Sequence, residues 1–155
     1  MKAIAGEGER ERAAPGQAGG IDLADVPEAL RQPVAAALAA AGVADGHLAL
    51  ELVEAERIRQ LNREHRGRDA PTDVLAFPID GPGPSAGPRE LGDVVICAAL
   101  CSNLTEAAVH GVLHLCGLDH EADAGEMLAL QEKILRAVEP PPPGPGARAR
   151  DFTLR

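Results

Sequence analysis

The sequence predicts an α+β fold in which helices pack on a small mixed β-sheet. Three segments have strand-like patterns and four have helical patterns, in the order α-β-α-β-β-α-α. Three strands are too few for a doubly wound sheet, so we expect the helices to cover a small sheet, with a histidine-rich helix at the centre. Aromatic residues make up only 1% of the 155 residues, so the core must be built from aliphatic side chains.

The first half of the domain is predicted to contribute a helix, a strand and a second helix. Apolar residues recur at four-residue steps in 27–41, a helical pattern that Pro33 should kink or split because proline lacks the N–H of a helix interior. In 47–53 the pattern changes to strict alternation, which predicts a strand with its three leucines on one buried face. Residues 54–65 return to helical spacing, and Gly67 is expected to stop that helix.

The charges narrow the possible function classes. A net charge of −9 is a poor match for a nucleic-acid-binding protein unless positive charge is concentrated locally. One basic stretch provides such a concentration, with five arginines in twelve residues: Arg57, Arg59, Arg63, Arg66 and Arg68. Such a run is usually a solvated helix face, but planar guanidinium groups are also well shaped for phosphate recognition.

The second half of the domain is predicted to add two strands and two helices. Residues 72–78 form a short strand ended by proline, and the β-branched run 91–97 forms another. The Gly/Pro-rich segment 81–88 between them predicts a mobile loop. Asp123 is expected to cap the last helix, whose apolar side chains recur at helical spacing as far as Val138.

The central helix is predicted from its cap and its histidines. Asn103 followed three residues later by Glu106 resembles a capping box, which starts a helix. On this helix His110 and His114 lie four residues apart, about 40° around the axis and roughly 6 Å along it. Two imidazoles in that arrangement can bind one metal ion, although a pair of this kind alone is more often found on a helix surface.

A third histidine turns this pair into a predicted metal site. Gly117 is expected to end the helix in a left-handed conformation and to return His120 toward the first two histidines. Three nitrogen ligands leave one tetrahedral position of a zinc ion free for water, which is the arrangement of catalytic zinc sites. Imidazole also binds copper, nickel and iron, so zinc is the expected metal among several that fit.

The residue after the first histidine argues against peptide hydrolysis. The spacing His-x3-His-x2-Gly-x2-His matches that of the metzincin proteases, which have a glutamate as general base where this chain has Gly111. Glycine cannot accept a proton, and it costs about 1 kcal/mol relative to alanine in a helix interior. We therefore expect that a bulky group approaches the helix backbone at Gly111, beside the metal.

The composition along the chain predicts its domain boundaries and its location. Residues 1–20 are predicted to be a disordered leader, 21–139 one domain, and 140–155 a disordered tail rich in Pro, Gly and Arg. Three cysteines without a Cys-x2-Cys pair do not suggest a disulfide scaffold. We recognise no signal peptide and no apolar run of membrane-spanning length, so we expect a soluble cytoplasmic protein with no membrane partner and no organic cofactor.

Four blocks of the sequence resemble the YbeY family, metal-dependent endoribonucleases of rRNA maturation. The stretch from Val109 to His120 meets every fixed position of the family pattern His-Gly-x-Leu-His-Leu-x-Gly-x-Asp-His. The other similar blocks follow the family order and lie at 61–78, 91–97 and 126–135. The resemblance covers roughly residues 47–138, which is most of the predicted domain.

This resemblance implies a site and roles for its residues. One zinc ion per chain is expected to be held by His110, His114 and His120, and a catalytic Arg66 is expected to face the metal. We assign substrate binding to Arg66 together with Arg63 of the basic stretch. The general base is not identified by the resemblance; Asp119 and Glu121 flank a ligand and are candidates for that role or for supporting the ligands.

The implied function is that of a single-strand-specific endoribonuclease in small-subunit rRNA end processing and ribosome quality control. Zinc-activated water would attack the phosphodiester, and the partners would be rRNA, small-subunit particles and ribosomal proteins. One alternative is a non-catalytic zinc-containing ribosome assembly factor, and another is a zinc hydrolase of a peptide or small ester. Family members usually have a longer connection before the histidine helix than the 98–108 segment here, so we expect this helix to lack its usual first turns.

Overall fold

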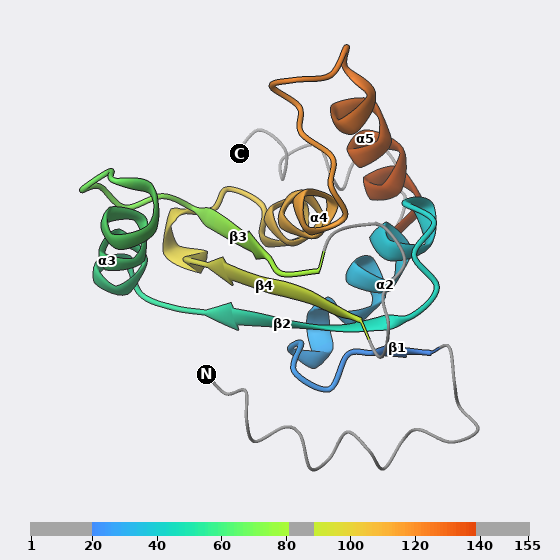
Figure 1. Ribbon diagram of the computed structural model, residues 1–155, viewed down its shortest axis with the longest axis horizontal. Coiled ribbons are helices and arrows are strands. Elements are labelled where there is room, and N and C mark those ends of the chain that lie inside the picture. Colours follow the sequence, from blue (N-terminus) through green and yellow to red (C-terminus); the bar gives the residue numbers. More distant parts are fainter. Residues whose placement is uncertain (1–19, 81–88, 139–155) are drawn as a thin grey trace, which may run out of the picture.

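The computed structural model describes residues 20–80 and 89–138, which form a mixed sheet covered by helices (Figure 1). The strands are β1 (Ile21–Asp22), β2 (Gly46–Leu52), β3 (Val74–Pro78) and β4 (Glu90–Ile96). The helices are α2 (Arg31–Ala40), α3 (Ala55–Arg66), α4 (Leu104–Leu115) and α5 (Glu126–Val138), with 3-10 turns at Glu28–Leu30 and Ala98–Leu100. The predicted α+β class is confirmed. The predicted leader (apart from Gly20), the 81–88 loop and the tail lie outside the described residues.

The sheet has the strand order β1-β2-β4-β3 within the described part of the chain. The pairs β1–β2 and β2–β4 are parallel, whereas β3 runs antiparallel to β4 and forms one edge. The antiparallel pair is joined by a local connection, and the parallel pairs need crossovers, which the helices provide. The edge position of β3 is important for the site, as described below.

The helices lie on both sides of the sheet, and the sheet separates the core into two clusters. α2, α4 and α5 lie on one side, and α3 lies near one end of the sheet (Figure 1). Alternation along β4 places Val94 and Ile96 in the larger cluster with the three helices. Val95 belongs to the smaller cluster on the other face, together with Ile58 of α3. α4 contacts β3, β4, α2 and α5, so it is the central helix that the sequence predicted.

The structure differs from the sequence prediction at two places. β1 was missed, since two residues are too short to show a period. The expected split of the 27–41 helix is present: a 3-10 turn precedes α2, and Pro33 lies in the first turn of α2, where backbone N–H groups have no helical partner. Leu52 lies at the end of β2 and is 43% exposed, so only two of the three leucines of that strand are buried.

Candidate metal centre

α4 starts at its predicted cap and packs unusually close to the sheet. The side chain of Asn103 accepts a hydrogen bond from the backbone N–H of Glu106 at 3.0 Å, which satisfies one free amide of the first turn. A Cβ atom at Gly111 would lie 2.6 Å from Cγ1 of Val94 and 3.2 Å from Cγ2 of Val74. The bulky group beside Gly111 is therefore the sheet itself, and a glutamate at this position would point into β4.

The structure brings the three predicted histidines together. His110 and His114 project from consecutive turns of α4, and Gly117 adopts a left-handed φ of 97° after the helix ends. The chain then returns His120 to the same place, and one ring nitrogen from each histidine lies within 4.8 Å of the others. The ring centroids are separated by 4.8 Å, 5.1 Å and 5.5 Å. The left-handed glycine thus does what the sequence predicted for it.

Hydrogen bonds hold the first two rings in one tautomer. Nδ1 of His114 lies 2.9 Å from the backbone carbonyl of Leu118, an acceptor, so Nδ1 carries the proton. Nδ1 of His110 lies 2.8 Å from Oε1 of Gln131, whose amide nitrogen donates to Oε2 of Glu106 at 3.2 Å. The Glu106 carboxylate can only accept, so the Gln131 amide nitrogen faces Glu106 and its oxygen faces His110. Both rings therefore keep the lone pair of Nε2 free for a metal.

The neutral imidazole that a metal requires is also favoured at His114. Burial lowers the pKa of His114 below its usual value because a charged imidazolium is poorly solvated there. The neighbouring His110 lowers the pKa of His114 further by charge repulsion. Metal ligation requires the unprotonated ring nitrogen, so this environment suits a cation site.

The residues present fit a tetrahedral ion with one open position. Zn–N distances of about 2.0–2.1 Å place ligand nitrogens roughly 3.4 Å apart in a tetrahedron, so a small rotation of the three rings is sufficient. Within residues 20–80 and 89–138, no carboxylate or thiolate completes the group as a fourth ligand. The arrangement can therefore hold a metal and leave room for a water or substrate oxygen.

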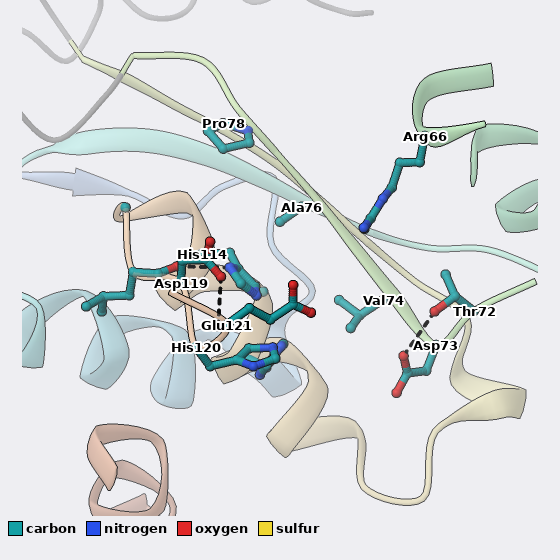
Figure 2. Close-up of a pocket in the computed structure, with 14 residues that line it drawn as sticks. Arg66, Thr72, Asp73, Val74, Ala76, Pro78, His114, Asp119, His120 and Glu121 are labelled. Carbon is teal, nitrogen blue, oxygen red and sulfur yellow. Dashed lines mark hydrogen bonds between the residues drawn. The ribbon is translucent and has the colours of Figure 1, made fainter. Parts of the chain in front are cut away.

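The histidines open into a cavity of about 560 Å³, which also contains Arg66. Arg66 lies at the end of α3 and points toward the cavity across β3 from the histidines (Figure 2). Asp119 and Glu121 also line this cavity. Oδ1 of Asp119 accepts from the backbone N–H of Glu121 at 3.0 Å, which shapes the turn, whereas the Glu121 carboxylate extends into the cavity (Figure 2).

Arg57, Arg59 and Arg63 of the basic stretch lie on α3 outside the cavity, and Arg68 follows the end of this helix. Arg59 pairs with Asp69 at 2.8 Å, and Arg63 lies 3.8 Å from the same carboxylate. Arg63 does not line the cavity, so its predicted role in substrate binding stays a prediction for a surface outside it. Part of the positive charge of this stretch is offset by Asp69.

Sequence reasoning missed Gln131. This side chain is 8% exposed and lies on the buried side of α5 with Met127 and Ile134. A polar residue four positions after Met127 and three before Ile134 breaks an apolar helical stripe, and that break was the available signal. Asp123 does cap the last helix as predicted, because its Oδ2 accepts from the backbone N–H of Met127 at 2.9 Å.

Comparisons with known proteins point to one family. A family profile described as "Endoribonuclease YbeY" matches residues 17–139. A protein named "Endoribonuclease YbeY" from Anaeromyxobacter sp. (strain Fw109-5) is 46% identical over 122 residues, covering 70% of this chain and 62% of that protein. Another of that name from Moorella thermoacetica is 40% identical over 131 residues, covering 70% of this chain and 84% of that protein. The chain thus spans less than two thirds of the first relative.

Among solved structures, the solution structure of TM1509 from Thermotoga maritima aligns with a TM-score of 0.46 at 25% identity, over 75% of this chain and 85% of that chain. The profile match covers well over half of the 155 residues and includes all three histidines and Arg66. On these grounds the chain belongs to the YbeY family.

Proposed function

We propose that this chain is a zinc-dependent endoribonuclease that cleaves single-stranded RNA in the maturation of small-subunit rRNA and in ribosome quality control. One observation carries the proposal: three convergent imidazoles with an open coordination position share a cavity with Arg66. A metal ligand set beside a fixed cation suits a phosphodiester, whose reaction builds negative charge on phosphate oxygens. The relatives' printed name, "Endoribonuclease YbeY", supports the substrate class.

His110, His114 and His120 would hold one zinc ion per chain. Bound there, zinc would supply Lewis acidity that activates water and stabilises phosphate charge. Gln131 and the Leu118 carbonyl keep two of the rings oriented by accepting their Nδ1 protons. The protein's part at this end of the cavity is to fix three ligands and to leave one position open.

Two charged side chains of the cavity would bind the phosphate and accept the proton of the attacking water. Arg66 binds the phosphate and neutralises the charge that grows on its oxygens during attack. We assign the general base to Glu121 rather than Asp119, because the Asp119 carboxylate already accepts the backbone N–H of Glu121 and the Glu121 carboxylate extends into the cavity. Glu121 would take a proton from the attacking water.

The proposed partners are rRNA, small-subunit particles and ribosomal proteins, and the proposed location is the cytoplasm. A net charge of −9 opposes tight binding of free RNA, so Arg63, Arg66 and a ribosomal surface would provide the missing positive charge. Across the two described stretches, we find no helix with the length and apolar character needed to span a membrane.

The test compares metal content with cleavage of an rRNA precursor and of an unstructured RNA. We expect His114→Ala to lose both metal and activity, and Arg66→Gln to keep the metal and lose at least tenfold in cleavage rate. Arg57→Gln is the matched control, because Arg57 lies near the other end of α3 and bonds to Gln60 rather than lining the cavity. Metal-loaded wild type without nuclease activity, or full activity in Arg66→Gln, would contradict the proposal.

We keep a non-catalytic assembly factor as the second candidate function. His110 is the seventh residue of α4, and the resemblance to the family implies a longer segment before this histidine. Binding to ribosomal particles without cleavage would support this function. A peptide hydrolase of the metzincin type is disfavoured, because Gly111 is pressed against β4 and leaves no room for the glutamate base.

A further inference from the structure

The register of β3 determines which of its backbone groups face the open edge of the sheet. The backbone N–H of Cys97 donates to the carbonyl of Asp73 at 2.9 Å, and that of Ile79 donates to the carbonyl of Leu91 at 3.1 Å. An antiparallel ladder alternates between hydrogen-bonded and non-hydrogen-bonded pairs. The odd-numbered residues of this segment therefore face β4, and the even-numbered ones face away from it.

The backbone groups that face away from β4 are those of Val74, Ala76 and Pro78. A hydrogen bond of β4 supports this register. The carbonyl of Ile96, the residue opposite Val74, points away from β3 and accepts from the backbone N–H of Val53, which follows β2, at 2.8 Å. β3 is the last strand of the sheet among the described residues, so no further strand pairs with this edge there. The edge thus presents the N–H groups of Val74 and Ala76 and three carbonyls, since proline has no N–H.

This edge strand borders the cavity of the metal centre. Val74, Ala76 and Pro78 line that cavity, and the side chains of Val74 and Ala76 pack with the larger cluster on the α4 face of the sheet. Arg66 comes from α3, which packs in the smaller cluster on one face of the sheet, and the histidines come from α4 on the other face. A ligand that contacts both Arg66 and the histidines must therefore pass over the edge of β3 (Figure 2).

We propose that the free edge of β3 binds the ribose-phosphate backbone of single-stranded RNA. The N–H of Ala76, assisted by that of Val74, donates to non-bridging phosphate oxygens, and the adjacent carbonyls accept from ribose 2′-hydroxyls. The inference rests on the proposed endoribonuclease function and names how its substrate is held. Backbone amides bind phosphate without reading base sequence, and the 2′-hydroxyl is a donor that DNA lacks.

This mode of binding fits the charge of the protein. Amide hydrogen bonds to phosphate require no cationic side chain, so a chain with a net charge of −9 can hold RNA with few arginines. The same edge would contribute to a preference for RNA over DNA, because only RNA has the 2′-hydroxyls that donate to the strand carbonyls.

The test removes a single edge N–H. Ala76→Pro deletes a donor that makes no bond to β4, and Pro78 shows that this edge accommodates proline two residues on. We expect about a tenfold loss in kcat/KM for a single-stranded RNA oligonucleotide, the scale of one hydrogen bond to a charged group. Zinc content and Tm should remain at the wild-type values.

Ala55→Pro is the matched control. Ala55 is the exposed first residue of α3 and follows a residue with extended backbone, a position that tolerates proline. Its kcat/KM should equal that of wild type. The slope of log(kcat/KM) against log[salt] adds a second readout. It should be unchanged in Ala76→Pro and shallower in Arg66→Gln, because only a cationic side chain that binds a phosphate releases counterions from the RNA.

The outcomes separate this inference from the proposed function. Wild type that cleaves no RNA would overturn both. If wild type is active and Ala76→Pro has the same kcat/KM, the edge proposal alone is overturned. It is also overturned if Ala76→Pro loses binding to an extended peptide while its RNA cleavage is unchanged, because that result would indicate strand pairing with a peptide instead. Should the proline variant fail to fold, semisynthetic replacement of Ala76 by lactate removes the same N–H without ring atoms, and the same criteria apply.

Discussion

Oε1 of Gln131 lies 2.8 Å from Nδ1 of His110 and ties the last helix to the first histidine of the site. Gln131 is nearly buried, and its nitrogen is held by the carboxylate of Glu106 at 3.2 Å. Reversal of the amide would place its oxygen against that carboxylate, so the orientation of Gln131 is fixed by charge. The orientation in turn fixes which nitrogen of His110 is available to a metal.

Replacing Gln131 by leucine should weaken zinc binding without unfolding the protein. Loss of an outer hydrogen bond to a ligating histidine typically costs about 10–100-fold in metal affinity, and we expect an effect of that size for Gln131→Leu. Competition with a chromophoric chelator measures it. Gln60→Leu on the surface of α3 is the control, and equal affinities in the two variants would show that the amide does not orient His110.

Alanine at Gly111 should destabilise the protein although alanine favours helices. The added methyl gains about 1 kcal/mol of helix propensity but overlaps Val94 of β4, and such overpacking typically costs about 1–3 kcal/mol. We expect a net loss in the free energy of unfolding, measured by urea denaturation, together with weaker zinc binding as α4 is pushed outward. In a Val94→Ala background the methyl has room, so the cost of Gly111→Ala should shrink; strict additivity would contradict the contact.

A histidine far from the metal centre should make stability depend on alkaline pH. Nε2 of His47 lies 2.8 Å from Asp25, and its Nδ1 lies 2.8 Å from Glu90. The hydrogen bond to Glu90 is the main cause that raises the pKa of His47 to about 9, and Asp25 adds to it. Because the pKa of His47 is higher in the folded than in the unfolded state, its protonation stabilises the folded state fully at pH values below the unfolded pKa of about 6.5. This stabilisation is lost as the pH rises through 9.

The free energy of unfolding should therefore fall between pH 7 and pH 9.5 in wild type and less so in His47→Gln. Asp25 is exposed, so we expect only about 1–2 kcal/mol after allowance for solvent screening. Urea titrations at several pH values measure the difference. His65→Gln, an exposed residue of α3, should follow wild type, and a His47→Gln curve that also follows wild type would remove the role of this ring.

Local sequence signals predicted most of the site, because the ligands are close in sequence. The four-residue step from His110 to His114, the Asn103 cap and the left-handed Gly117 each depend on a few neighbouring residues, and the structure has all three features. Apart from β1, the strands and the helices were predicted in the same way from their periods.

Partners distant in sequence could not be predicted in this way. Gln131 lies 21 residues from His110, and no local rule connects them. The ion pairs of Asp69 with Arg59 and Arg63 depend on how the chain turns after α3, so the sequence did not show which arginines of that helix are paired. The predicted metal-binding and catalytic roles of the side chains stay predictions until the variants above are measured.

The close approach of Gly111 to Val94 also limits what this histidine spacing can do. A single substitution to glutamate does not convert this site into that of a protease, because α4 would first have to move away from β4 and would carry His110 and His114 with it. Such a conversion would require a new position for α4 as well as a general base. The distance between α4 and β4 thus limits which side chain can follow His110.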